Sequence, residues 1–287
     1  MTLTNDYVFK RVFGHVGNEK ITAGLISSII KQEIKMIKIN ENPITEKDMK
    51  DDKVGILDLK AKLNNEIICN VEMQVIQQKD IDRRIMFYWS KTYTGEIKES
   101  EKNGLLKKAI VILIANFELE NLKEISKFHT KWQIREEDFR KIILTDTLEI
   151  HIIELPKLVK QLRENKGNKK DKVALWSMFI LNPENVGEED MNENEDLKLA
   201  KEELEKLKQD EHERYMAELR IKYIRDSQAI EDYGFDRGLE QGRKQGIKQG
   251  EKDSKLKIAK KLLDLEMPIE EIVQITELTE EEIKNIK

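Results

Sequence analysis

Residues 56–76 read ILDLKAKLNNEIICNVEMQVI, and two segments of this stretch alternate between apolar and polar side chains. Residues 56–63 place leucine and alanine on one face, and residues 67–76 place Cys69, valine and methionine on one face. The opposite, mostly polar faces contain Asp58, Lys60 and Lys62 in the first segment and Asn70, Glu72 and Gln74 in the second. This period of two predicts two antiparallel strands, each with one buried face.

The length of the turn determines which residues face one another across this hairpin. A two-residue turn at 64–65 sets a charged face against an apolar one, whereas a three-residue turn at 64–66 keeps the polar faces together. Asparagine suits the left-handed position that such a turn needs. We therefore predict the three-residue turn. It pairs Asp58 with Glu72, Lys60 with Asn70 and Lys62 with Ile68.

Two carboxylates that face each other across a strand pair repel, because their Cβ atoms lie only about 4.5–5.5 Å apart. A divalent cation removes that conflict, since Asp58 and Glu72 can then both bind one Mg²⁺ or Mn²⁺ ion. The competing interpretation is an ordinary solvated sheet face. Helices expected at residues 20–31 and 79–98 are available to cover this face, which favours a cleft.

Composition restricts the class of protein. The chain has 287 residues, of which 39% are hydrophobic and 37% charged, so it holds enough apolar material for a sizeable core. Its single cysteine, Cys69, excludes an intrachain disulfide. The longest apolar run, residues 109–115, is far shorter than the roughly 20 residues of a membrane span. With no secretory signal in the first residues, we expect a soluble, cytoplasmic protein without a membrane partner.

The order of predicted elements is helix, strands, helix, strand, which indicates an α/β core. We expect this core to span residues 1–182. An acidic linker and charged helix follow at 183–233, then a basic segment with periodic glycines at 234–254, and a small helical unit at 255–287. The four histidines of the chain show no spacing that suggests a metal site or an acid–base pair.

The pattern D-x-K on one strand and V-E-M-Q on the next resembles the PD-(D/E)XK nuclease superfamily. In particular, the chain is similar to the recombination-promoting nucleases, also called PD-(D/E)XK nuclease family putative transposases. The similarity extends to NDYVFKRVFG at residues 5–14 and to the long helical and apolar stretch at residues 82–114. It implies a restriction-endonuclease-like core, a central mixed sheet flanked by helices, over about residues 1–182.

The resemblance also implies roles for single residues. Asp58 and Glu72 match the acidic metal ligands of the motif. Gln74 falls where many members of the superfamily have lysine, although the resembled group itself commonly has glutamine there. Because a neutral amide does not stabilise charge as an ammonium does, another cation is needed. Lys60, on the same strand face as Asp58, is our candidate, and Lys62 is the alternative.

Four further residues are weaker candidates. Asp6 matches the N-terminal motif of the family, although capping the first helix is its more common role. Glu19, at a helix start, either helps to bind a second metal or favours the helix dipole. Arg83 and Tyr88, on the helix after the site, are candidates for phosphate contacts, and core packing is the ordinary role of such a tyrosine.

The activity that follows from the resemblance is Mg²⁺-dependent (or Mn²⁺-dependent) hydrolysis of DNA phosphodiester bonds, in recombination or mobile-element processing. A second interpretation is a nuclease-fold protein that binds DNA or acts as a scaffold with weak or no catalysis. Gln74 in place of lysine keeps that alternative open.

Glycines recur every fourth residue near the end of the chain, at Gly234, Gly238, Gly242, Gly246 and Gly250. Each costs a helix about 1 kcal/mol relative to alanine. A bare stripe of this kind lets another helix approach closely, so we expect a homo-oligomer formed through this helical region. A basic tether that binds DNA phosphates, and a passive repeat without a role, are the alternatives.

Overall fold

A computed structural model describes residues 1–40, 59–77, 80–95 and 106–286. The chain divides into two compact units, Met1–Ile224 and Arg225–Lys287, which we describe separately. None of the described helices is long and apolar enough to cross a membrane.

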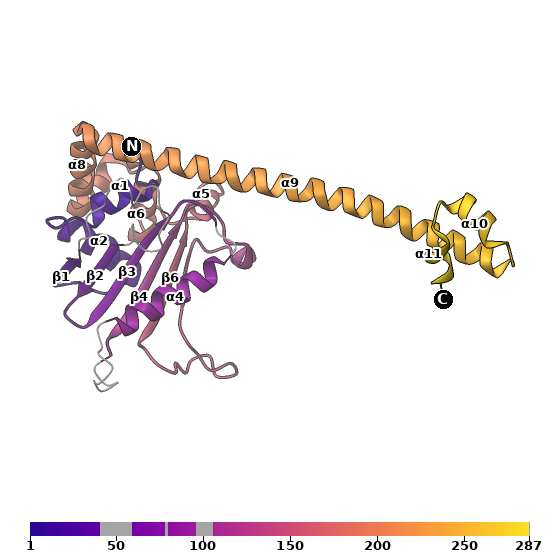
Figure 1. Cartoon of the computed structure of the whole chain (residues 1–287). Helices are drawn as coiled ribbons and strands as arrows, with labels where there is room; N and C mark the ends of the chain where they lie inside the picture. Colours follow the sequence, from indigo (N-terminus) through magenta and orange to yellow (C-terminus); the bar gives the residue numbers. More distant parts are fainter. Residues whose placement is uncertain (41–58, 78–79, 96–105, 287) are drawn as a thin grey trace. The chain divides into compact units, whose positions relative to one another are not determined.

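Unit 1 is built on a six-stranded mixed sheet, shown in Figure 1. Its strands in chain order are β1 (Ile37–Asn40), β2 (Leu59–Leu63), β3 (Ile67–Gln74), β4 (Lys108–Ala115), β5 (His129–Trp132) and β6 (Leu148–Glu154). Their order across the sheet is β1-β2-β3-β4-β6-β5. The first three strands pair antiparallel, β3, β4 and β6 pair parallel, and β5 adds antiparallel to β6. The predicted mixed sheet flanked by helices is therefore confirmed.

The β2–β3 hairpin has the predicted register. Leu63 pairs with Ile67 and Lys60 with Asn70, so three residues form the turn. Asn64 and Asn65 have φ values of 49° and 60°, the left-handed conformation that asparagine tolerates. The side chain of Asn64 also accepts hydrogen bonds from the backbone just before β1, which joins this strand to the turn. Asp58, the residue before β2, lies outside the described residues.

One face of the sheet carries the larger core. Leu59, Ala61, Cys69 and Val71 point into it, as the alternating pattern predicts. The helices that supply its other apolar side chains are α1 (Asp6–Phe13), α2 (Glu19–Ile30), α5 (Leu155–Arg163), α6 (Lys172–Leu181), α7 (Glu188–Glu193), α8 (Glu195–Gln209) and the start of α9 (Glu211–Asp264). Two short 3-10 helices, η2 (Glu120–Leu122) and η3 (Pro183–Asn185), complete the unit.

The opposite face of the sheet is covered by α4 (Ile81–Thr94), which Figure 1 shows lying against the sheet. Ile81 and Ile85 of α4 pack on Val111 and Leu113 of β4 in a second apolar cluster. We expected two helices over the polar face of the hairpin. Of these two helices α4 takes that position, whereas the apolar side of α2 belongs to the larger core on the other face.

The first turns of α9 are joined to α1 by buried ionic and polar contacts. Arg220 binds Asp6 through two N–H groups, at 3.0 and 2.6 Å, and both side chains are about nine-tenths buried. Glu213 accepts hydrogen bonds from Tyr7 and Arg11. These contacts place the start of α9 in unit 1, next to the beginning of the chain.

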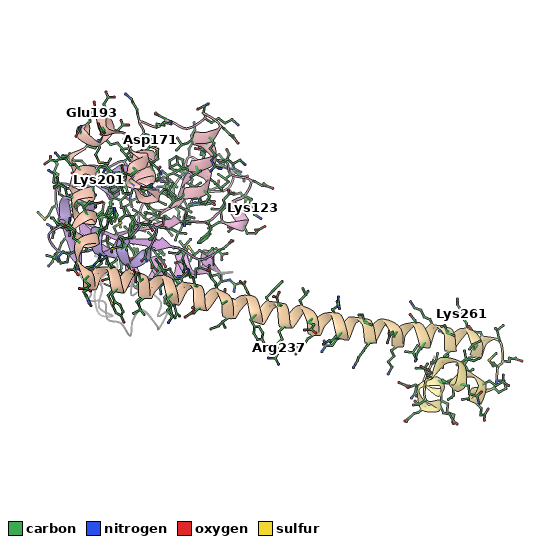
Figure 2. All side chains as sticks on the ribbon, turned by 90° about the horizontal axis from the view of Figure 1, so that it is seen from above. Lys123, Asp171, Glu193, Lys201, Arg237 and Lys261 are labelled. Carbon is green, nitrogen blue, oxygen red and sulfur yellow. The ribbon has the colours of Figure 1, made fainter. Side chains whose placement is uncertain are left out.

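Unit 2 contains the rest of α9 with α10 (Ile269–Thr276) and α11 (Glu280–Lys284). The last turns of α9 pack on α10 and α11 around Ala259, Ile272 and Ile283. Thr279 and Glu282 form a capping box at the start of α11. Upstream, around Arg237, every residue from 228 to 254 is exposed, as Figure 2 illustrates.

Asp6→Ala should destabilise unit 1 and loosen the start of α9. Removing one partner of a buried ion pair costs about 3–5 kcal/mol, because the other charge stays buried. Urea unfolding followed by fluorescence should show this loss, and hydrogen exchange should speed up in residues 211–224. Glu164→Gln, which removes an exposed pair with Lys166, is the control and should leave both measurements unchanged. Unaltered exchange in residues 211–224 of Asp6→Ala would contradict the role given to this ion pair.

Candidate functional site

The polar face of β3 is buried rather than solvated. The exposed fractions of Asn70, Glu72 and Gln74 are 0%, 5% and 9%. Glu72 lies beside Leu113 of β4, and Leu113 lies beside Ile152 of β6, so Glu72 shares its side of the sheet with the apolar cluster under α4. An ordinary solvated face is therefore excluded for these three residues.

The carboxylate of Glu72 is bound by Arg84 of α4. The distance from Arg84 Nη2 to Glu72 Oε1 is 2.6 Å, and the two side chains are 17% and 7% exposed. A carboxylate in so dry a place is strongly destabilising unless it is paired, and a guanidinium meets that need with a charge-assisted hydrogen bond. The contact joins the middle of β3 to the first turns of α4.

The helical period of α4 explains why Arg84 reaches this site. Ile81, Ile85 and Tyr88 form the buried side of the helix, and Arg84 lies three residues after Ile81 and four before Tyr88. Its guanidinium carbon lies 5.3 Å from the centre of the Tyr88 ring, a cation–π contact. Tyr88 is 3% exposed, so it packs between the helix and the sheet as well as contacting Arg84.

Three predicted polar residues of the hairpin lie on the same face of the sheet as Glu72. Gln74, one strand period further along β3, donates an amide N–H to the carbonyl oxygen of Ile76 at 3.0 Å. That bond uses the amide nitrogen and leaves the carbonyl oxygen as the acceptor. Lys60 is half-buried and lies opposite Asn70, on the same face as Glu72. Lys62 is also half-buried, opposite Ile68.

Three other candidates from the sequence are not brought to Glu72. Arg83 lies on the exposed side of α4. The carboxylate of Asp6 is bound by Arg220, and Asn5 rather than Asp6 is the N-cap of α1. Glu19 begins α2 and accepts a hydrogen bond from the backbone N–H of Gly17. Both α1 and α2 cover the other face of the sheet.

Arg84 is the residue that the sequence analysis missed. Its neighbour Arg83 was selected instead, although the spacing of Ile81, Ile85 and Tyr88 already places Arg84 toward the sheet. Because the buried positions of an amphipathic helix recur at intervals of three and four residues, a charged residue at such a position was the available signal.

The donors for a metal ion are oxygen atoms. Within the described part of the chain, no group of three or more His, Cys, Asp or Glu side chains is placed to hold an ion. The site offers the Glu72 carboxylate and the amide oxygen of Gln74, both of a kind that Mg²⁺ and Mn²⁺ accept. A complete site here needs a second carboxylate, and Asp58 is the predicted one.

Comparisons with known proteins support the family suggested by the motif. The model of the PD-(D/E)XK nuclease family transposases matches residues 3–234. No curated protein and no solved structure matches significantly. The match covers the sheet, α4 and the helices of unit 1.

A double-mutant cycle should measure a favourable coupling between Glu72 and Arg84. Arg84→Met should lower the free energy of unfolding by about 3–5 kcal/mol, because it leaves the Glu72 carboxylate buried without its cation. Adding Glu72→Gln to Arg84→Met should restore part of that loss, giving a coupling of roughly 1–3 kcal/mol by urea unfolding.

The exposed pair Lys123 and Glu120 provides a matched control. Its coupling should stay below about 1 kcal/mol, as for solvated ion pairs in general. A coupling for Glu72 and Arg84 no larger than this would show that the contact does not hold β3 to α4.

Proposed function

This chain belongs to the PD-(D/E)XK nuclease family transposases, and from that premise we propose that it is a Mg²⁺-dependent (or Mn²⁺-dependent) DNA endonuclease. The proposed reaction is hydrolysis of phosphodiester bonds in recombination or mobile-element processing, in the cytoplasm. Membership of the family supports a nuclease-type function in general. The reaction, its metal and its substrate are the proposal.

The observation that carries this proposal is the burial of the Glu72 carboxylate on the polar face of β3. An uncharged residue at this position would serve a purely structural sheet at least as well, because replacing a buried ion pair by apolar residues is often neutral or stabilising. Ionisable groups placed at such a cost are concentrated at functional sites. The resemblance of the hairpin motif and this placement both support Glu72 as a residue of the site.

In the proposed mechanism, Glu72 and Asp58 hold the metal ion. Asp58 directly precedes Leu59, whose ladder partner is Val71, the neighbour of Glu72. The proposal therefore requires the Asp58 side chain to come within reach of Glu72. When bound, the ion activates water as the nucleophile and neutralises charge that develops on the scissile phosphate.

The other residues position these groups. Arg84 fixes the orientation of the Glu72 carboxylate and brings a permanent positive charge to the place where Gln74 offers none. The carbonyl oxygen of Gln74 is suited to accept a hydrogen bond from the attacking water. Lys60, with Lys62 as the alternative, is the proposed donor to a non-bridging phosphate oxygen.

A second candidate function is DNA binding or scaffolding with weak or no catalysis. One specific observation favours it. A cation of the protein itself, the Arg84 guanidinium, lies 2.6 Å from the Glu72 carboxylate. In this candidate the ion pair replaces the metal, and the acidic residue has a structural role only.

Glu72→Gln and Asp58→Asn should each reduce cleavage of supercoiled plasmid by more than about 100-fold, since even residues that merely support metal ligands cost 10–100-fold when removed. Nicked and linear products should appear with Mg²⁺ or Mn²⁺ and disappear with chelator. Glu66→Gln is the control, because Glu66 lies in the exposed turn of the same hairpin and its loss should change nothing.

The same ions should raise the melting temperature of the wild-type chain and not that of Glu72→Gln, because ligand binding to the folded state is stabilising. Wild-type protein that neither cuts plasmid nor gains stability from metal would eliminate the endonuclease and leave the DNA-binding candidate. Full activity in Glu72→Gln would refute the assignment of the site.

We also propose that the chain forms a homo-oligomer through the glycine-periodic part of α9. A Cβ atom added to any of the five glycines would meet no atom within 4 Å, so packing within the chain does not explain them. Large apolar side chains are also exposed there, such as Tyr233 and Phe235 at 68% and 70%. A second helix lying on this surface would account for both features.

Light scattering should give a mass that rises with protein concentration for the full chain. Gly238→Leu combined with Gly242→Leu should lower that mass toward the monomer, because bulk on the bare stripe prevents close approach of a second helix. Gln241→Leu with Gln245→Leu adds the same bulk one residue away from two of the glycines and is the control. A monomeric mass at every concentration would exclude the oligomer.

A further inference from the structure

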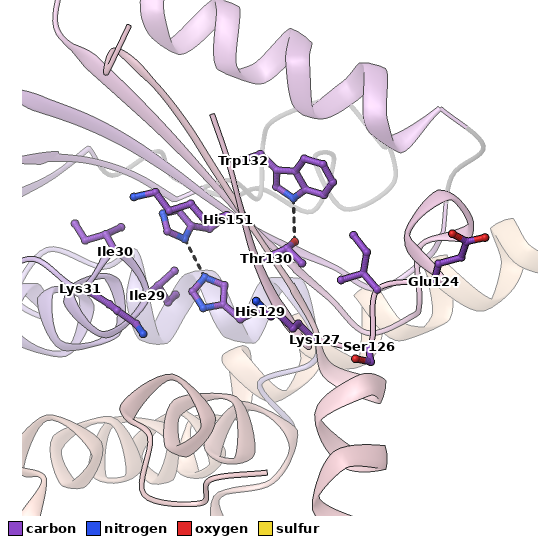
Figure 3. A pocket seen from close by; sticks show the side chains of 12 residues that line it. Ile29, Ile30, Lys31, Glu124, Ser126, Lys127, His129, Thr130, Trp132 and His151 are labelled. Carbon is purple, nitrogen blue, oxygen red and sulfur yellow. Dashed lines mark hydrogen bonds between the residues drawn. The ribbon is translucent and has the colours of Figure 1, made fainter. Parts of the chain in front are cut away.

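A pocket of about 750 Å³ lies at the β5 edge of the sheet, beside the C-terminal end of α2. Figure 3 shows His129 and His151 on one of its walls. His151 lies beside Ile112, which belongs to the larger core, so the two histidines are on the opposite side of the sheet from Glu72. The pocket is therefore separate from the proposed nuclease site.

Three titratable side chains form a hydrogen-bonded chain that ends at this pocket. His151 Nε2 lies 2.8 Å from Glu149 Oε1, and His151 Nδ1 lies 2.9 Å from His129 Nε2. Glu149 and His151 are each 2% exposed, whereas His129 is only part-buried. The spacing of the histidines gave no sign of this pair, because the antiparallel pairing of β5 with β6 brings them together.

The hydrogen bonds restrict which nitrogen atoms carry protons. An ionised carboxylate only accepts, so His151 donates from Nε2 to Glu149, and a neutral His151 accepts at Nδ1. In that tautomer His129 donates to His151 from Nε2, and the Nδ1 atom of His129 is unprotonated. This arrangement leaves a basic ring nitrogen at the pocket end of the three hydrogen-bonded side chains.

Glu149, at the inner end of these three hydrogen-bonded side chains, is held as an anion. Burial alone would raise the pKa of Glu149, but hydrogen bonds from His151, Lys108 and Lys131 hold it well below its usual range. The ammonium groups of Lys108 and Lys131 lie 2.8 and 3.0 Å from Glu149 Oε2. Glu149 therefore stays ionised. Because Lys108 and Lys131 neutralise its carboxylate, it adds little negative potential to the pocket.

His129, at the pocket end of these side chains, is neutral near pH 7. Burial lowers the pKa of His129 to about 4, with further contributions from His151, Lys31 and Lys131. The charges around the pocket favour an anion, since Lys31 and Lys127 line it against a single acid, Glu124, while a third lysine, Lys131, is paired with Glu149. The carbonyl end of α2 contributes about half a negative charge, which the ammonium of Lys31 next to it opposes.

We propose that this pocket binds the phosphate group of a small phosphate monoester and that His129 takes up a proton when the ligand binds. Figure 3 shows Lys31 and Lys127 directed toward the region of His129, where an anion would meet their ammonium groups. A bound dianion would offset the repulsion between these lysines and a protonated His129. The same dianion would accept the new N–H of His129.

The size of the pocket indicates that the ligand is larger than inorganic phosphate. A volume of about 750 Å³ lies within the range of pockets for small organic ligands. Trp132, which lies on the other face of the edge strand β5 from His129, lines the pocket there; the residue is 39% exposed, and its indole N–H is held by a hydrogen bond to Thr130 at 2.9 Å. An exposed, fixed aromatic ring suits the base of a nucleotide.

Titration calorimetry of the full chain with inorganic phosphate and with a 5′-mononucleotide tests this inference. Both should bind, and the nucleotide should bind more tightly. Lys31→Gln and His129→Gln should each weaken binding about tenfold, whereas Lys169→Gln, an exposed lysine outside the pocket, should leave it unchanged. Glutamine at position 129 keeps an N–H donor toward His151, so the chain of hydrogen bonds is retained.

Repeating the titrations in buffers of different ionisation enthalpy counts the protons taken up. The wild-type chain should take up more protons than His129→Gln with the same ligand, and protonation of the ligand itself cancels in this comparison. Equal uptake in the two proteins would overturn the role of His129. The site itself would be overturned if neither anion binds, if only duplex DNA binds, or if Lys169→Gln weakens binding as much as Lys31→Gln.

Discussion

The ion pair between Glu72 and Arg84 joins the central strand β3 to α4, the helix that covers this side of the sheet. Glu72 lies where neighbouring strands supply leucine and isoleucine, and a carboxylate in such surroundings is stable only if its charge is matched within a few ångströms. Arg84 provides the match at 2.6 Å. The contact adds to the apolar packing of Ile81 and Ile85 that places α4 on this face of the sheet.

The sheet separates two buried polar systems. Glu72 and Arg84 lie on the α4 side, and the chain of Glu149, His151 and His129 lies on the other. Both contain an anionic glutamate on a parallel strand that is neutralised by basic side chains. They differ in the basic side chain that ends each system. In the first it is an arginine, which is always protonated, and in the second it is a histidine, which can gain a proton.

The hairpin was the most predictable part of the structure, because strict alternation and two asparagines leave one register that keeps both polar faces together. Prediction from the sequence was weaker wherever contacts join distant segments. Nothing local indicates that α2 covers the opposite face from α4, that Leu204 and Leu207 of a highly charged helix enter the main core, or that β5 pairs beyond β6. Arg84 and the histidine pair were missed for the same reason, since their partners lie 12 and 22 residues away.

The tie between Asp6 and Arg220 also bears on how the chain is made. The two residues are 214 positions apart, and the Asp6 carboxylate of α1 is paired with Arg220 of α9. At about 5–20 residues per second, synthesis needs roughly 10–40 s to proceed from one residue to the other. During that time the growing chain has the strands of its sheet before it has the helix that secures its first residues. Chaperones that bind nascent chains would therefore encounter a nearly complete sheet. At that stage α1 would still lack its ion pair with α9.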